Sequence, residues 1–166
     1  MKILKNASTA IKLGYDLSRL ANAKTVVYST FPPNVFKLDN IFNVELTYGY
    51  IFHENSRINI CFVYCPPKIA SFSLFKKAFA HLHNKYDIKQ PHINMGDFNL
   101  DFYHVKTFPT YSSSEYSLYQ LITSSTTNYD SLLDHIYTNI DKSQIHSAGV
   151  LESYFSDHKP IFIALH

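Results

Sequence analysis

The most regular feature of the hydrophobic pattern is a strict alternation at residues 57–65. One face of this segment carries Ile58, Ile60, Phe62 and Tyr64. The other face is also largely apolar beyond Asn59, which is typical of a strand buried on both sides. Pro66 and Pro67 follow and cannot donate to a sheet, so Tyr64 is expected at the end of this strand, beside a rigid loop.

Apolar residues three and four positions apart predict a helix over residues 71–85, with Ser71 as its N-cap. A short apolar run predicts a strand at 92–96, and the order strand–helix–strand favours alternating α/β connections. Ser112 and Glu115 have the spacing of a capping box, so a second helix is expected over 113–122. The remaining expected elements are one or two strands over 41–52, strands over 25–30, 132–138, 145–151 and 160–165, and a weaker helix within 8–20.

Asp97 and Asn99 follow the run at 92–96, after Gly96, which lets the backbone turn where a Cβ would obstruct it. A carboxylate at a strand end can orient and deprotonate a water, and an amide can hold a phosphate oxygen. Taken alone, this segment is better explained by a turn that uses Asp and Asn for backbone hydrogen bonds. Two further motifs, around Asp134 and around Asp157 and His158, favour a catalytic role for this segment over a simple turn.

Asp134, Asp157 and His158 also lie against apolar strands, where an unpaired carboxylate is costly. Asp134 could hydrogen-bond one ring nitrogen of His158, fixing its tautomer and raising its basicity. Asp157 could then bind a divalent cation through oxygen, as Mg²⁺ prefers, while His158 contacts a phosphate oxygen or acts on the nucleophile. Unrelated turn acids and a capped histidine would explain any one of these residues, but not three motifs in this order.

The composition indicates a single folded domain, because 46% of the 166 residues are hydrophobic and only 17% are charged. A net charge of +2 permits a polyanionic partner without requiring one. No apolar run has the length of a membrane span and the N-terminus lacks a signal-peptide pattern, so an intracellular protein of the nucleus or cytoplasm is expected. Cys61 and Cys65 would lie about 13 Å apart on one strand face, too far for a disulfide, so both are expected as buried thiols.

Three motifs together resemble the signature of the endonuclease/exonuclease/phosphatase superfamily, which includes the DNase I-like enzymes. They are Gly-Asp-Phe-Asn at 96–99, Leu-Asp-His-Ile at 133–136 and Ser-Asp-His at 156–158. Val-Tyr-Cys-Pro-Pro at 63–67 resembles the tyrosine-bearing strand end of the same family. The resemblance covers residues 25–166 and leaves 1–24 as a segment of uncertain nature. It implies an α/β fold, a two-sheet sandwich with flanking helices (the four-layer αββα arrangement), incomplete at its N-terminal end.

The resemblance also implies roles for individual residues. Asp97 would activate the attacking water, Asn99 would orient the water and the phosphate, and Tyr64 would lie on the phosphate side. Asp134 would support His158, His158 would contact the scissile phosphate, and Asp157 would lie near the metal. The implied cofactor is Mg²⁺ or Mn²⁺ and the implied partner is DNA. The residues of these motifs are most similar to those of mobile-element proteins. A reverse transcriptase or helicase domain, missing or fused, is therefore expected.

One departure from the family pattern leaves two hypotheses open. The family normally begins with a strand carrying Asn and a strand carrying the main metal-binding Glu, and residues 1–24 contain no Glu. Glu45 and Glu54 fall in another part of the pattern, so the metal is expected to bind weakly. The first hypothesis is a Mg²⁺-dependent phosphodiesterase, namely a DNA endonuclease derived from a mobile element. The second is a catalytically impaired remnant that binds nucleic acid or a protein.

Overall fold

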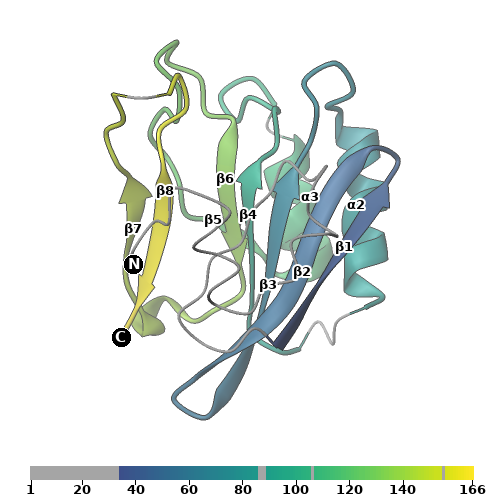
Figure 1. Ribbon diagram of the computed structural model, residues 1–166, viewed down its shortest axis with the longest axis vertical. Helices are drawn as coiled ribbons and strands as arrows, with labels where there is room; N and C mark the ends of the chain where they lie inside the picture. The colour runs from purple at the N-terminus through teal and green to yellow at the C-terminus, as the bar shows by residue number, and fades with distance from the viewer. Residues whose placement is uncertain (1–33, 86–88, 106, 155) are drawn as a thin grey trace, which may run out of the picture.

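Two β-sheets pack against each other, with two α-helices on the outer face of the larger sheet (Figure 1). This computed structural model describes residues 34–85, 89–105, 107–154 and 156–166. Within them the larger sheet has six strands in the order β1-β2-β3-β4-β6-β5. Its strands are β1 (Asn34–Ile41), β2 (Val44–His53), β3 (Ser56–Tyr64), β4 (His92–Asp97), β5 (Tyr119–Gln120) and β6 (Asp134–Thr138).

The smaller sheet consists, in the described residues, of β7 (Ile145–Val150) and β8 (Ile161–Leu165), paired antiparallel. The helices are α2 (Phe72–His83), α3 (Thr107–Tyr116) and the short 3-10 helix η2 (Lys142–Gln144). β3 and β4 run parallel and α2 connects them, which confirms the expected strand–helix–strand unit. Ser71 caps α2 as predicted, because its hydroxyl oxygen accepts a hydrogen bond from the Leu74 amide at 3.3 Å.

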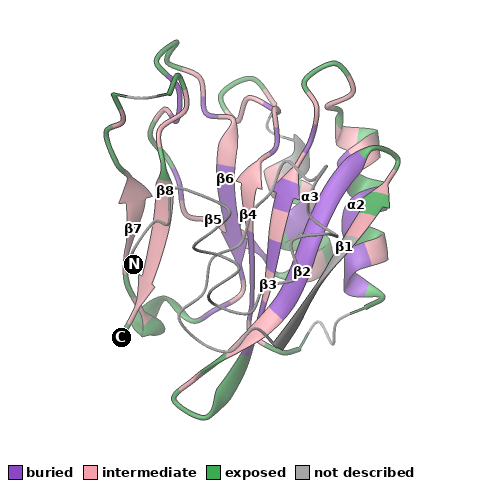
Figure 2. Ribbon diagram, in the orientation of Figure 1, coloured by how far each residue is buried: buried purple, intermediate pink, exposed green. Residues whose placement is uncertain are grey.

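Buried residues lie mainly on the central strands of the larger sheet and on α2 (Figure 2), and the alternation of side chains along the strands divides the core into two apolar layers. Cys61 and Val63 of β3 pack with Phe75 and Phe79 of α2. Residues of the opposite face, such as Ile58 and Ile93, pack with the smaller sheet through Ile161 and Ile163. The described residues therefore form three layers, helices on sheet on sheet, and the predicted two-sheet sandwich is confirmed.

The prediction of a helix over 113–122 was wrong. Helix α3 begins at Thr107 and ends at Tyr116, so Ser112 lies inside it, buried, with its hydroxyl donating to the Pro109 carbonyl at 3.0 Å. The segment after α3 is extended because the Gln120 side-chain oxygen and the Ile136 carbonyl accept its backbone amides. Leu118 packs in the helix-side layer and Ile122 in the opposite layer. Their spacing of four fits a helical stripe equally well, which explains the error.

The expectations for the first part of the chain, a helix within 8–20 and a strand over 25–30, lie outside the described residues. Cys61 and Cys65 are both buried free thiols, as predicted. None of the helices that the structure describes has the length and apolarity needed to cross a membrane.

Burial of His83 predicts a loss of stability in acid. Its Nδ1–H donates to the Phe79 carbonyl at 2.7 Å, its ring stacks on Tyr116 at 3.9 Å, and its Nε2 is buried with no partner among the described residues. A protonated ring would need an acceptor at Nε2. Burial therefore lowers the pKa of His83 from 6.5 to about 4. Because the unfolded chain binds this proton more readily, the free energy of unfolding falls as pH drops from 6.5 toward 4.

We expect His83→Gln to remove about 2 kcal/mol of the stability difference between pH 7 and pH 5, measured by urea unfolding. His146→Gln, at an exposed position of β7, is the matched control for the loss of one histidine. An unaltered pH dependence in His83→Gln would contradict the assignment of this proton to His83.

Candidate functional site

Strand register brings the predicted acids to one end of the larger sheet. Tyr64 at the end of β3 pairs with Asp97 at the end of β4, and Asp97 pairs with Asp134 at the start of β6. Paired residues of adjacent strands project to the same face of a sheet, so these three side chains form one row. The row lies on the face that packs, further along the strands, against the smaller sheet.

Gly96 makes this register possible. Its φ is +140°, and a Cβ at this position would lie 2.1 Å from the Val63 carbonyl oxygen of β3. Only glycine allows β4 to approach β3 so closely in that conformation. The sequence predicts a turn at Gly96, and the close contact with Val63 adds a steric reason for glycine at this position.

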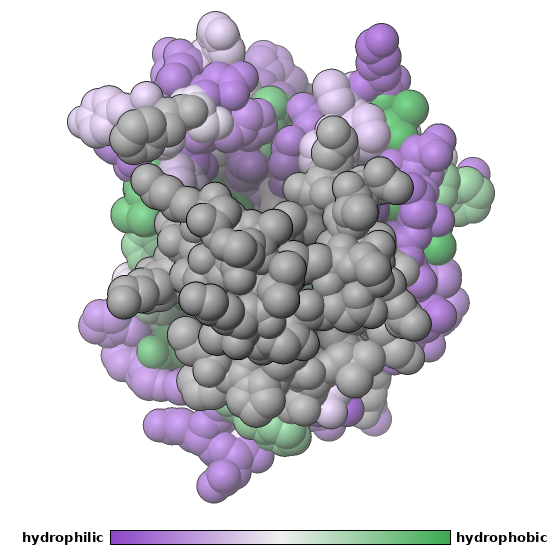
Figure 3. All heavy atoms as spheres, in the orientation of Figure 1, coloured by the Kyte–Doolittle hydropathy of each residue, from purple (hydrophilic) through white to green (hydrophobic). Residues whose placement is uncertain are grey.

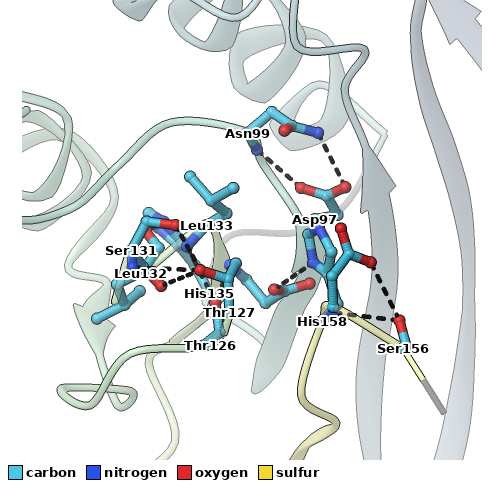
Figure 4. Close-up of polar contacts among 12 residues, drawn as sticks. Asp97, Asn99, Thr126, Thr127, Ser131, Leu132, Leu133, His135, Ser156 and His158 are labelled. Carbon is cyan, nitrogen blue, oxygen red and sulfur yellow. Dashed lines mark hydrogen bonds and ion pairs between the residues drawn. The ribbon is translucent and has the colours of Figure 1, made fainter. Parts of the chain in front are cut away.

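Asn99 holds the Asp97 carboxylate through two hydrogen bonds (Figure 4). Its backbone amide donates to Oδ1 at 2.9 Å and its Nδ2 to Oδ2 at 2.8 Å. Nδ2 also donates to the Cys65 carbonyl at 2.9 Å, so both amide hydrogens of Asn99 are engaged. In this arrangement Asn99 positions Asp97 and ties it to the loop after β3.

Asp134 and His158 make the contact that the sequence predicted. The Nδ1–H of His158 donates to Oδ2 of Asp134 at 2.8 Å, and the side chain of Asp134 is only 13% exposed. This bond leaves Nε2 of the imidazole available for a ligand. The pairing of Asp134 with His158 is therefore confirmed, although the two residues lie 24 positions apart.

Thr126 positions this pair and was missed by the sequence analysis. Its hydroxyl oxygen accepts the backbone amides of Leu133 and Asp134, each at 3.0 Å. Its carbonyl accepts the Lys159 amide at 2.7 Å, which ties the segment before β6 to the residue after His158. Thr126 lies in a polar connecting segment, and no pattern in the sequence distinguishes it from the neighbouring threonines.

His135 was also left without a role, and the structure gives it one. Its Nε2–H lies within hydrogen-bond distance of the Leu100 carbonyl at 2.9 Å and the Leu132 carbonyl at 3.1 Å. The ring stacks on Phe98 at 4.8 Å. Burial lowers the pKa of His135 to about 4, so it is neutral at pH 7. His135 thus joins the loop that follows Asp97 to the loop that precedes Asp134.

Asp157 and Glu45 lie at the margins of the row. Asp157 is exposed, and its backbone carbonyl accepts the Asn128 amide at 3.0 Å. Glu45 of β2, which falls outside the family pattern, is buried and pairs directly with Tyr64 of β3. The register therefore extends the row of polar side chains to a third carboxylate.

Burial and mutual repulsion shape the charges of the site. Burial raises the pKa of Asp97 to about 6, and the negative charge of Asp134 contributes to the rise. Burial opposes a charge on His158, but the Asp134 carboxylate and then Asp97 hold its pKa above the usual value. The site therefore concentrates negative charge that a cation would stabilise.

Asp97, Asp134 and His158 each offer a donor atom, and these atoms lie within 4.8 Å of one another. Two carboxylates with raised pKa are the oxygen ligands that Mg²⁺ and Mn²⁺ prefer. The donor set thus fits a divalent cation. Asp157, the metal ligand proposed from the sequence, lies outside this group of three but next to His158 in the chain.

No protein-family model matches the chain, and no curated protein matches it in sequence. Solved structures do. An endonuclease/exonuclease/phosphatase family protein from Leptotrichia buccalis has a TM-score of 0.54 at 17% identity, covering 74% of this chain and 54% of that one. A mannosyl-6-phosphatase from Bacteroides thetaiotaomicron gives 0.52 at 19%, covering 74% and 57%. The human Nocturnin catalytic domain with bound sulfate gives 0.52 at 18%, covering 78% and 60%.

The chain therefore has the fold of the endonuclease/exonuclease/phosphatase proteins, the DNase I-like two-sheet sandwich. It spans 54–60% of the length of these three structures. At identities of 17–19%, the likeness establishes the fold and leaves the activity to be argued from the site.

The Asp134–His158 pair predicts a measurable change in titration. Asp134→Asn removes the carboxylate that favours the imidazolium, so the pKa of His158 should fall. Asp157→Asn is the control: it removes a negative charge that acts more weakly on His158 and should lower the pKa less. Both values are obtained by NMR titration of the histidine ring protons. An equal or larger fall in Asp157→Asn would show that the 2.8 Å contact does not govern His158.

Proposed function

We propose that this protein is a divalent-metal-dependent phosphodiesterase of the endonuclease/exonuclease/phosphatase superfamily that cleaves DNA. The observation that carries the proposal is the meeting of Asp97, Asp134 and His158 at one edge of the sheet, with donor atoms within 4.8 Å. The fold shared with a mannosyl-6-phosphatase and with an endonuclease/exonuclease/phosphatase family protein supports it.

Asp97 is the general base in this proposal. Its pKa of about 6 lies close to neutral pH, where a base is both available and able to take a proton from water. Asn99 holds both carboxylate oxygens, at 2.9 and 2.8 Å, so the direction of proton transfer is defined before substrate arrives.

His158 binds the phosphate of the substrate. The Asp134 carboxylate accepts from Nδ1–H and raises the pKa of the ring, which favours the imidazolium form, and in that form Nε2–H donates to a phosphate oxygen. A charge-assisted bond of this kind stabilises the additional negative charge of the transition state.

Asp134, together with Asp157 as the resemblance implies, would hold Mg²⁺ or Mn²⁺ beside the Asp97 carboxylate, which stays uncoordinated and acts as the base. When bound, the metal supplies charge stabilisation for phosphodiester cleavage. The proposed substrate is DNA. The residues of the three motifs are most similar to those of mobile-element proteins, so the proposed origin is a mobile element with a reverse transcriptase or helicase partner domain. A catalytically impaired remnant that binds nucleic acid or a protein is the competing proposal.

Plasmid nicking tests the two proposals. Wild-type nicking in Mg²⁺ is expected to be weak, because the main metal-binding Glu of the family pattern is not found in residues 1–24. Asp97→Asn keeps the size of the side chain, removes its charge and replaces one of the two oxygens that accept from Asn99, so it should lower the rate by about 10²–10⁴-fold while the overall fold is retained. EDTA should abolish nicking.

Asp141→Asn is the matched control, since Asp141 is an exposed carboxylate that accepts the Ser143 amide at 2.8 Å at the start of η2. This variant should nick at the wild-type rate. Equal nicking by wild type and Asp97→Asn would count against Asp97 as the base. Retained DNA binding without any nicking would favour the remnant.

A further inference from the structure

Two tyrosines beside the candidate site are almost fully exposed. Tyr154 is 89% and Tyr129 80% exposed, more than any other large hydrophobic residue that the structure describes. Other exposed aromatic rings have partners: Phe52 contacts Tyr50 at 5.7 Å, and Lys77 lies 5.2 Å from the ring of Phe42. The described residues provide no ring contact for Tyr129 or Tyr154, so their faces are open to a ligand.

Both tyrosines lie in loops attached to the site. Asn128, which precedes Tyr129, donates its amide to the Asp157 carbonyl at 3.0 Å and its Nδ2 to the Ser156 carbonyl at 3.4 Å. Tyr154 precedes Asp157 by three residues, a chain length of about 11 Å at most. The rings therefore lie within a few nucleotide lengths of His158. Hydrophilic side chains gather over these loops in the space-filling view (Figure 3).

Lys68 lies on the other side of the row and offers a positive charge. It is exposed and belongs to the loop after β3. In this loop the Cys65 amide donates to the Asp97 carbonyl at 2.9 Å, and the Cys65 carbonyl accepts from Nδ2 of Asn99. β3 flanks β4 on one side and β6 flanks it on the other. A strand of nucleic acid crossing Asp97 would thus meet a cation on the β3 side and two aromatic rings on the β6 side.

We propose that Tyr129 and Tyr154 form a stacking site for unpaired bases next to the phosphate that the site attacks. An exposed aromatic ring stacks on the face of any base, and each such contact contributes about 1–3 kcal/mol to binding. In a duplex these base faces are covered by neighbouring bases, so only unpaired nucleotides offer them. The substrate class is therefore single-stranded nucleic acid, or an unpaired segment of a duplex, and the inference rests on the phosphodiesterase function proposed above.

The absence of tryptophan from the chain allows a direct test. Tyr129→Trp and Tyr154→Trp each introduce one fluorophore at the proposed site, and Phe52→Trp places one at the opposite end of β2 as the control. Each variant is titrated in EDTA, which prevents cleavage, with a 12-nucleotide single strand and with the blunt duplex of the same sequence. Single-stranded DNA should quench both site fluorophores in a saturable way, the duplex should not, and the Phe52→Trp fluorescence should not change.

Tyr129→Ala and Tyr154→Ala should each weaken binding of the single strand by about 5- to 150-fold without changing the circular dichroism spectrum. Affinities within twofold of wild type, or equal quenching by single strand and duplex, would overturn the stacking site. No quenching by either oligonucleotide would also overturn it and leave the rings to a protein partner. The two proposals can fail independently. Quenching without Asp97-dependent nicking supports the stacking site alone. Nicking without quenching supports the phosphodiesterase alone.

Discussion

The close approach of β4 to β3 at Gly96 is the constraint on which the site depends. The Val63 carbonyl occupies the space of a side chain at this position, so the parallel pairing of Tyr64 with Asp97 requires glycine. The antiparallel pairing of Asp97 with Asp134 follows from the same placement of β4. One backbone contact thereby sets the spacing of side chains that come from three strands.

The carboxylates of Asp97 and Asp134 lie side by side in a partly buried place, and this arrangement costs free energy. The structure offsets this cost with directed hydrogen bonds: Asn99 donates twice to Asp97, and His158 donates to Asp134. These bonds reduce the repulsion only in part, because burial keeps the pKa of Asp97 near 6. Such residual destabilisation is typical of sites that bind a cation or move a proton.

The base of the site is buried and hydrogen-bonded, and its rim is exposed. Thr126 and His135, both buried, hold the segments next to Asp97 and Asp134 by hydrogen bonds to backbone groups. Tyr129 and Tyr154 extend from the same end of the sandwich into solvent. Buried, hydrogen-bonded groups beneath exposed aromatic rings would suit the proposed nucleic-acid substrate, because binding could be spread along the polymer while the reacting phosphate is held in one place.

The amino-acid sequence by itself determined the main strands, helix α2 with its Ser71 cap, and the identity of the acids, because these depend on local periodicity and on residues next to one another. It failed at 113–122, where Leu118 and Ile122 fit a helical stripe but belong to opposite layers of the core. Only the tertiary structure placed Glu45 in line with Tyr64 and gave Thr126 and His135 their roles. Strand register and hydrogen bonds between distant segments decide these positions, and such contacts leave no local pattern in the chain.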